Sequence, residues 1–126
     1  MAGHGHDVVR CPNTYCYFDY YQSQERSSEP PASGAYLPLD RVYAFEPVPK
    51  NLPPSYRNHI LGGQANLWTE YVPSLWQAEY MMFPRLCASS EVNWSPERAR
   101  NWNDFRQRLE QHLKRLDQLK VNYRKL

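Results

Sequence analysis

The chain of 126 residues lacks several features that mark common protein classes. It has only three cysteines, an odd and low number that excludes a small domain built on disulfides. It has no run of about 18 apolar residues, which excludes a membrane-spanning helix. The formal net charge of +2 is too small to indicate a nucleic-acid partner. Residues 1–7 lack the basic and apolar segments of a secretory signal.

Aromatic residues and prolines are abundant instead. The chain contains ten tyrosines, four tryptophans, four phenylalanines and 11 prolines. So many Trp and Tyr side chains in a short chain predict an aromatic-lined surface in addition to a core. Charge is uneven: residues 1–96 hold six Lys/Arg and nine Asp/Glu, whereas residues 97–126 hold nine and four. This change in composition divides the chain into two parts after residue 96.

Two segments have the pattern of β-strands. Asp7–Cys11 predicts a short buried strand, and the aromatic stretch Asn13–Tyr21 that follows predicts an extended chain. Gln22–Gly34 is polar and ends in Pro, Ser and Gly, which predicts a loop. Ile60–Val72 predicts a second strand, with small apolar residues on one face and polar or aromatic residues on the other. A polar strand face of this kind indicates a site at the end of the strand.

Two helical segments follow the second strand. Ser74 with Gln77 three residues later forms a capping-box pattern, and Leu75–Val92 is apolar nearly all round, which predicts a buried helix kinked at Pro84. Ser95 followed by proline predicts another helix start. From residue 102 the apolar side chains recur at helical spacing, with charged residues between them, at Trp102, Phe105, Leu109, Leu113, Leu116 and Leu119.

Strands separated by long crossovers predict parallel pairing and an α/β fold. Parallel strands need neighbours on both edges and cover on both faces, so two of them do not form a complete sheet. The pattern therefore predicts a section of a larger α/β sheet or barrel.

Several motifs, in this order and spacing, resemble the β-N-acetylhexosaminidases of glycoside hydrolase family 20. The resemblance runs from about His6 to Tyr123 and rests on six short runs. They are Gly5-His6-Asp7-Val8-Val9, Pro12-Asn13-Thr14, Tyr17-Phe18-Asp19, Gly62-Gly63-Gln64-Ala65-Asn66-Leu67-Trp68-Thr69-Glu70, Phe83-Pro84-Arg85-Leu86, and Glu91-Val92-Asn93-Trp94-Ser95. It implies barrel strands seven and eight, the last barrel helix, and the barrel exit.

The resemblance implies that the fold is the last quarter of a (β/α)₈ TIM barrel. A complete barrel needs about 250 residues, so residues 1–96 would supply only part of one, and residues 97–126 a C-terminal amphipathic helix. The family's adjacent catalytic Asp-Glu pair would lie upstream, and no Asp-Glu or Glu-Asp dipeptide occurs here. We therefore expect a truncated gene, a split reading frame or a cloned piece that is inactive alone. Complete relatives are often secreted, periplasmic or lysosomal.

The resemblance also implies roles for four side chains. In this family the substrate's own acetamide oxygen attacks the anomeric carbon. Tyr17 would donate its hydroxyl to that oxygen, and a phenol suits this role as a neutral donor. Asp19 would accept from a sugar hydroxyl, the 6-OH, and Glu70 from the 4-OH, while Trp68 offers a flat apolar face to the ring. From spacing alone, Tyr17 is better explained as a packed aromatic, Trp68 fits a core tryptophan, and Asp19 and Glu70 fit solvated carboxylates. The W-x-E spacing at one strand end, with Tyr-x-Asp in the preceding strand, favours the functional interpretation of all four.

Other functions remain as alternatives. His4, His6, Cys11 and Cys16 do not have the spacing of a structural zinc site, so we expect no metal, and the resemblance implies no cofactor. The expected partners are N-acetylhexosamine-containing glycans and the missing N-terminal part of the same enzyme, with no nucleic acid and no membrane. There are two alternatives: a non-catalytic remnant that binds sugar, and an interaction module that uses the basic C-terminal helix.

Overall fold

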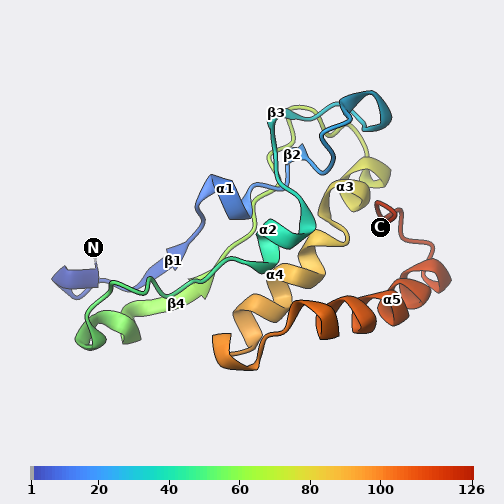
Figure 1. Cartoon of the computed structure of the whole chain (residues 1–126). Coiled ribbons are helices and arrows are strands. Elements are labelled where there is room, and N and C mark those ends of the chain that lie inside the picture. Colours follow the sequence, from blue (N-terminus) through green and yellow to red (C-terminus); the bar gives the residue numbers. More distant parts are fainter. Residues whose placement is uncertain (1) are drawn as a thin grey trace.

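The computed structural model describes residues 2–126 and contains short strands, helices and long connections (Figure 1). The strands and α-helices follow in the order β1 (Val8–Arg10), α1 (Asn13–Cys16), β2 (Tyr20–Tyr21), β3 (Ser33–Tyr36), α2 (Leu39–Tyr43), β4 (Ile60–Gly63), α3 (Leu75–Met82), α4 (Arg85–Trp94) and α5 (Trp102–Gln118). The described residues also form four 3₁₀ segments, one before β1 at Ala2–His4 and three between the later elements, at Arg26–Ser28, Pro54–His59 and Glu97–Ala99. Within residues 2–126, no helix is both long and apolar enough to cross a membrane.

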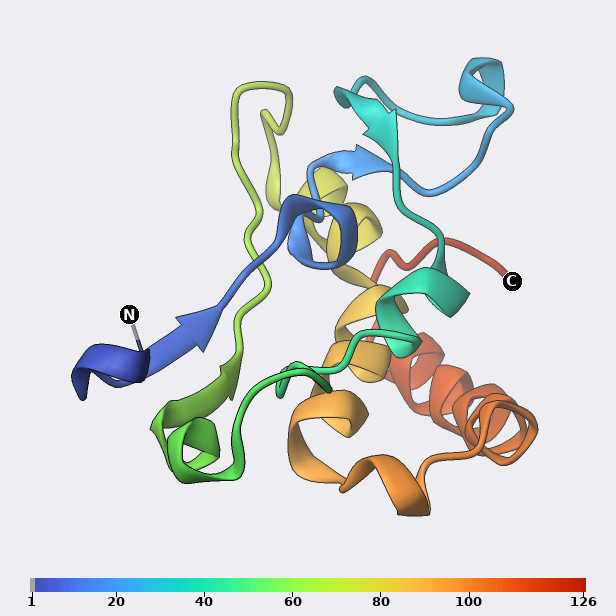
Figure 2. The ribbon, with the colours of Figure 1, turned by 60° about the vertical axis from the view of Figure 1, so that its left-hand side comes forward.

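The predicted parallel pairing of the two main strands is confirmed. β1 pairs with β4 in parallel, with Val8 opposite Ile60 and Arg10 opposite Gly63 (Figure 2). The regular part of the second strand ends at Gly63, well short of the predicted Val72, because its partner β1 ends at Arg10 and pairing returns only at the isolated bridge between Tyr17 and Asn66. β1 is also less buried than predicted: β4 is its one partner among the described residues, so Val9 stays about half exposed.

The sequence predicts an extended chain over Asn13–Tyr21, and the structure is extended over only part of this stretch. Residues 13–16 form the single helical turn α1, because Pro12 accepts hydrogen bonds from the amides of Tyr15 and Cys16 through its carbonyl. The chain then becomes extended and meets the second strand again at Asn66. This turn rotates Tyr15 away from the side that Tyr17 occupies, and Tyr15 stacks on Phe45 with ring centroids 5.4 Å apart.

A second pair of parallel strands, β2 and β3, flanks the segment predicted to be a loop. Tyr20 lies opposite Ser33, and Tyr21 lies opposite Tyr36. A strand of two residues shows no alternation of polar and apolar side chains, so the sequence pattern did not reveal this pairing.

The predicted buried helix 75–92 is two helices, α3 and α4, separated at Phe83–Pro84. Ser74 caps α3 as predicted, accepting from the Gln77 amide at 3.2 Å. Burial increases along α3: Met81 is fully buried, whereas Trp76 is 66% exposed, so the prediction of burial all round is wrong for the first turn.

The amphipathic helix α5 begins at Trp102 as its spacing predicts, and its apolar stripe is buried at Phe105, Leu109, Leu113 and Leu116. Asn101 caps it, accepting from the Asp104 amide at 3.0 Å, whereas the predicted start at Ser95 leads only into a 3₁₀ turn. Leu119 lies beyond the end of the helix and is 72% exposed.

The core lies where α2, α4 and α5 meet (Figure 1). Tyr43 of α2 stacks on Phe105 of α5, with ring centroids 4.6 Å apart. Its hydroxyl donates to Glu91 of α4 at 2.8 Å, and Arg108 of α5 holds both oxygens of the same carboxylate. Burial, with the neighbouring Glu91, raises the pKa of Tyr43 to about 12. One carboxylate therefore ties the three helices together.

Candidate functional site

The four side chains predicted from the sequence lie around one hollow. Tyr17, Asp19, Trp68 and Glu70 line an open depression of about 430 Å³. Tyr20, Ser33 and Tyr71 complete its wall. The structure therefore brings together residues that are about 50 positions apart in the sequence.

Backbone pairing between two segments produces this convergence. The amide of Phe18 donates to the carbonyl of Asn66 at 2.7 Å, and the Asn66 amide donates to the carbonyl of Cys16 at 2.8 Å. After this bridge the chain turns at residues 18–19, where the Tyr20 amide donates to the carbonyl of Tyr17 at 3.4 Å. Tyr17 and Asp19 nevertheless line the same hollow as Trp68 and Glu70. The rings of Tyr17 and Trp68 lie with their centroids 6.1 Å apart and tilted by 60°.

Trp68 has a face available for a ligand. Its side chain is 50% exposed and lines the hollow. A tryptophan that packed in the core beneath α3 would be buried, so the exposure of Trp68 shows that it is not a core residue of this kind. An exposed indole next to carboxylates presents a flat apolar surface with polar groups at its edge, which suits a sugar ring.

Asp19 is a buried acceptor with unused capacity. The residue is only 5% exposed, and its Oδ1 has no hydrogen-bond partner among the described residues. Burial raises the pKa of this carboxyl, and the nearby carboxylate of Glu70 adds to the rise, whereas the positive charge of Arg85 opposes it. A buried carboxylate oxygen without a partner is costly, and a ligand hydroxyl would satisfy it.

The raised pKa of Asp19 gives a prediction about stability. The pKa of Asp19 is higher in the folded state than in the unfolded chain. The folded state therefore loses stability as the pH rises from the unfolded-state pKa through the folded-state pKa, and below the unfolded-state pKa there is no such loss. We expect Asp19→Asn, which removes this ionisation, to raise the Tm at neutral pH and to leave it nearly unchanged in acid. Thermal melts from acid to neutral pH measure this, and a variant less stable than the parent at neutral pH would contradict it.

Sequence reasoning missed part of this site. Ser33 reaches the hollow through the β2–β3 pairing, and its amide donates to the backbone carbonyl of Asp19 at 2.9 Å. Tyr71 also lines the hollow, and the one sign of this in the sequence was its position directly after Glu70. Arg85 lies beneath the site with no exposed surface, although it stands in one of the motifs noted above.

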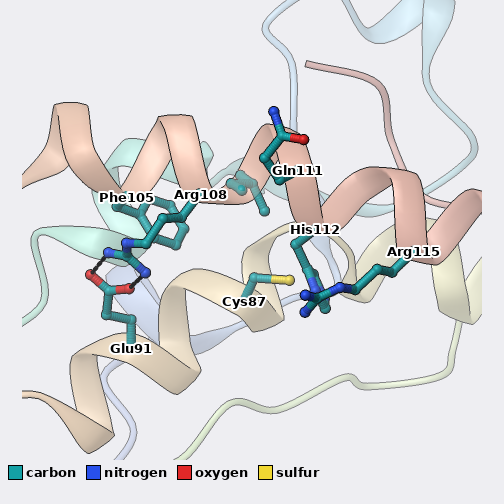
Figure 3. A pocket seen from close by; sticks show the side chains of 8 residues that line it. Cys87, Glu91, Phe105, Arg108, Gln111, His112 and Arg115 are labelled. Atoms are coloured by element: carbon teal, nitrogen blue, oxygen red, sulfur yellow. Dashed lines mark hydrogen bonds and ion pairs between the residues drawn. The ribbon is translucent and has the colours of Figure 1, made fainter.

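A second hollow lies between α4 and α5 and measures about 410 Å³ (Figure 3). Its walls carry Cys87, Glu91, Arg108, His112 and Arg115. Glu91 and Arg108 already neutralise each other through two hydrogen bonds, and burial raises the pKa of the Cys87 thiol to about 11, which makes it a poor nucleophile. Among the described residues, none that lines this hollow has a buried side-chain polar atom without a partner, in contrast to Asp19.

The described part of the chain offers no metal centre, since residues 2–126 contain no group of three or more His, Cys, Asp or Glu side chains placed to hold an ion.

Comparison with known proteins gives a family match for most of the chain. Residues 1–97 match the model of "Glycosyl hydrolase family 20, catalytic domain". A β-hexosaminidase of Porphyromonas gingivalis is 41% identical over 123 residues, which are 97% of this chain and 16% of that protein. A β-hexosaminidase of Akkermansia muciniphila is 32% identical over 86% of this chain and 21% of its own length. The chain thus spans about a fifth or less of these relatives.

Solved structures show the same likeness. An exo-β-N-acetylglucosaminidase of Vibrio harveyi, crystallised as an inactive mutant, superposes with a TM-score of 0.86 at 39% identity, covering 98% of this chain and 20% of that one. The same enzyme in complex with N-acetylglucosamine gives 0.83 at 38% identity over the same shares. These neighbours confirm the predicted α/β fold as part of a TIM barrel. Together with the family match over residues 1–97, they show that the chain belongs to glycosyl hydrolase family 20.

Proposed function

We propose that this chain forms part of the sugar pocket of a β-N-acetylhexosaminidase, which removes terminal β-linked N-acetylhexosamines by substrate-assisted retaining catalysis. The single observation that supports the proposal is the hollow that Tyr17, Asp19, Trp68 and Glu70 share. The glycosidase class follows from the family, whereas the roles of these four residues are the proposal itself.

Each residue type suits its proposed role. Tyr17 donates its hydroxyl to the acetamide oxygen and stabilises the charge that develops as the oxazolinium ring forms. Asp19 and Glu70 accept hydrogen bonds from the 6-OH and 4-OH groups, because ionised carboxylates have only acceptors to offer. Trp68 packs under the apolar face of the ring and fixes the sugar's orientation.

Proton transfer to the leaving group needs a general acid from outside these residues. We propose that residues 1–96 form the barrel section, that residues 97–126 form an appended helix, and that the rest of the barrel supplies the Asp-Glu pair. The chain's partners are then N-acetylhexosamine-containing glycans and that remaining barrel portion. A non-catalytic sugar-binding chain would use the same hollow without the pair.

A graft tests this proposal directly. The segment of the Porphyromonas gingivalis relative that aligns with this chain is replaced by the chain, and hydrolysis of nitrophenyl N-acetyl-β-glucosaminide is measured. We expect an active graft in which Trp68→Ala lowers kcat/KM by about 10–100-fold, because the sugar loses a large apolar contact.

Trp94→Ala is the matched control, since Trp94 is 92% exposed and is not among the residues that line the sugar hollow. We expect its kcat/KM to match that of the unmutated graft. A folded graft without activity, or one unaffected by Trp68→Ala, would refute the proposal.

A further inference from the structure

Arg85 opens α4 and is buried without any exposed surface. Buried arginines are rare unless their charge and donors are satisfied. No side-chain hydrogen bond from Arg85 goes to a carboxylate among the described residues; its donors go to backbone carbonyls instead. Its placement therefore depends on the path of the backbone around it.

The guanidinium group binds carbonyls from three separate segments. Nη1 donates to the carbonyls of Tyr20 at 3.0 Å and Leu37 at 3.1 Å, and Nε donates to the carbonyl of Met81 at 3.2 Å. Nη2 donates to the carbonyls of Phe18 and Met81. The group also lies over the Phe18 ring, 4.9 Å from its centroid. A planar fork with five donors suits this arrangement, and an ammonium group does not.

Two of these carbonyls, from Phe18 and Tyr20, belong to the residues on either side of Asp19. Arg85 thereby fixes the backbone that places Asp19 at the hollow, two residues after Tyr17. The charged and titratable groups around Arg85 are Glu29, Asp19, Arg124 and Tyr80, and Glu70 also acts on Asp19. Burial lowers the pKa of Arg85 to about 9, so the group remains charged at neutral pH.

We infer that Arg85 is a positioning residue for the sugar site, which holds the backbone on both sides of Asp19 and places a positive charge behind the Asp19 carboxylate. The inference rests on the proposed function, because it gives Asp19 the task of binding a sugar hydroxyl. Arg85 itself does not touch the sugar.

Two variants separate the two parts of this role. Arg85→Gln removes the charge but keeps two N–H donors, and Arg85→Lys keeps the charge but loses the fork. Arg100→Lys is the matched control. The Arg100 side chain is also buried, donates to the carbonyl of Phe45 at 2.9 Å and pairs with Glu46, and it is not among the residues that line the hollow.

The test uses the full chain labelled for NMR. The titration midpoint of the Asp19 carboxyl carbon and the amide shifts of residues 17–20 are recorded, and affinity is followed on the Trp68 indole signal as N-acetylglucosamine is added. We expect Arg85→Gln to raise the Asp19 midpoint, because the opposing positive charge is gone. We expect Arg85→Lys to leave that midpoint close to the parent value, to move the amide signals of residues 17–20, and to weaken sugar binding by about tenfold or more.

Arg100→Lys should change none of the three readouts. If Arg85→Gln does not fold, Arg85→Lys decides through the amide signals and the affinity. An unchanged Asp19 midpoint in folded Arg85→Gln, or unchanged amide signals in Arg85→Lys, would overturn the inference. If the parent chain binds no sugar by itself, the affinity of the graft replaces this readout, and a folded graft that binds none makes the proposed function fail. The Asp19 titration and the amide signals still decide the role of Arg85.

Discussion

The 126-residue chain alone is expected to release no nitrophenol from nitrophenyl N-acetyl-β-glucosaminide above the buffer blank. No Asp-Glu or Glu-Asp dipeptide occurs in it, so the general acid and the acetamide-orienting carboxylate of the family are absent from these residues. Acid–base assistance alone contributes typically about 10²–10⁴-fold to the rate. Turnover by the purified chain that Tyr17→Phe abolishes would overturn this expectation, and turnover that survives Tyr17→Phe would indicate a contaminant.

In the active graft, where activity is present, Tyr17→Phe should cause a large loss of kcat. Removing one donor that stabilises developing charge costs about 10²–10³-fold in kcat. The phenylalanine ring keeps the packing against Trp68 and Tyr20, so the fold should be unaffected. Tyr15→Phe is the control, because Tyr15 stacks on Phe45 outside the hollow. Equal kcat values for the two variants would remove Tyr17 from the mechanism.

The largest effect on stability is expected at Phe105. This side chain is buried between α2 and α4 and stacks on Tyr43. Phe105→Ala should lower the free energy of unfolding by about 3–5 kcal/mol, because it removes a large buried ring and leaves a cavity. Folded proteins usually have a free energy of unfolding of about 5–15 kcal/mol, so this substitution would remove much of the total stability.

Urea denaturation followed by circular dichroism measures this change. Leu119→Ala is the control, because Leu119 is largely exposed just beyond α5, and it should stay within about 0.5 kcal/mol of the parent. Equal effects of the two substitutions would show that α5 does not pack through its apolar stripe.

The parts of the fold that were predictable are those with a regular pattern. α5 was evident because its apolar residues recur on one face, and the capping of α3 was evident from Ser74 and Gln77. The parallel pairing of β1 and β4 followed from the long connection between two strand-like segments. Short elements without a period, such as α1 and the two residues of β2, left no such signal.

The candidate site was predicted from alternation and the family resemblance, although the structure has turns at residues 18–19 and at Glu70 where the alternation assumed an extended chain. Alternation placed Tyr17 with Asp19 and Trp68 with Glu70, and the structure places all four around one hollow. Arg85 was not predictable in the same way. An arginine at the start of a helix is usually exposed to solvent. The burial of Arg85 depends on carbonyls from two distant segments, at Tyr20 and Leu37, and from Met81 at the end of the preceding helix.

The basic residues of the C-terminal region are used within the fold. Arg108 pairs with Glu91, Arg100 with Glu46, and Arg124 with the buried Glu29. These pairs tie the appended segment to the core, and with Lys125, which pairs with Asp117, four of the nine Lys/Arg residues of 97–126 have a carboxylate partner. This favours the proposed enzyme section over an independent basic-helix module.

The most direct test of the proposed sugar pocket is a crystal structure of the graft with N-acetylglucosamine bound. We expect the sugar ring to lie over Trp68, the acetamide oxygen to accept a hydrogen bond from Tyr17, and the carboxylates of Asp19 and Glu70 to accept from ring hydroxyls. A sugar bound elsewhere, for example between α4 and α5, or one whose acetamide points away from Tyr17, would contradict the proposed function.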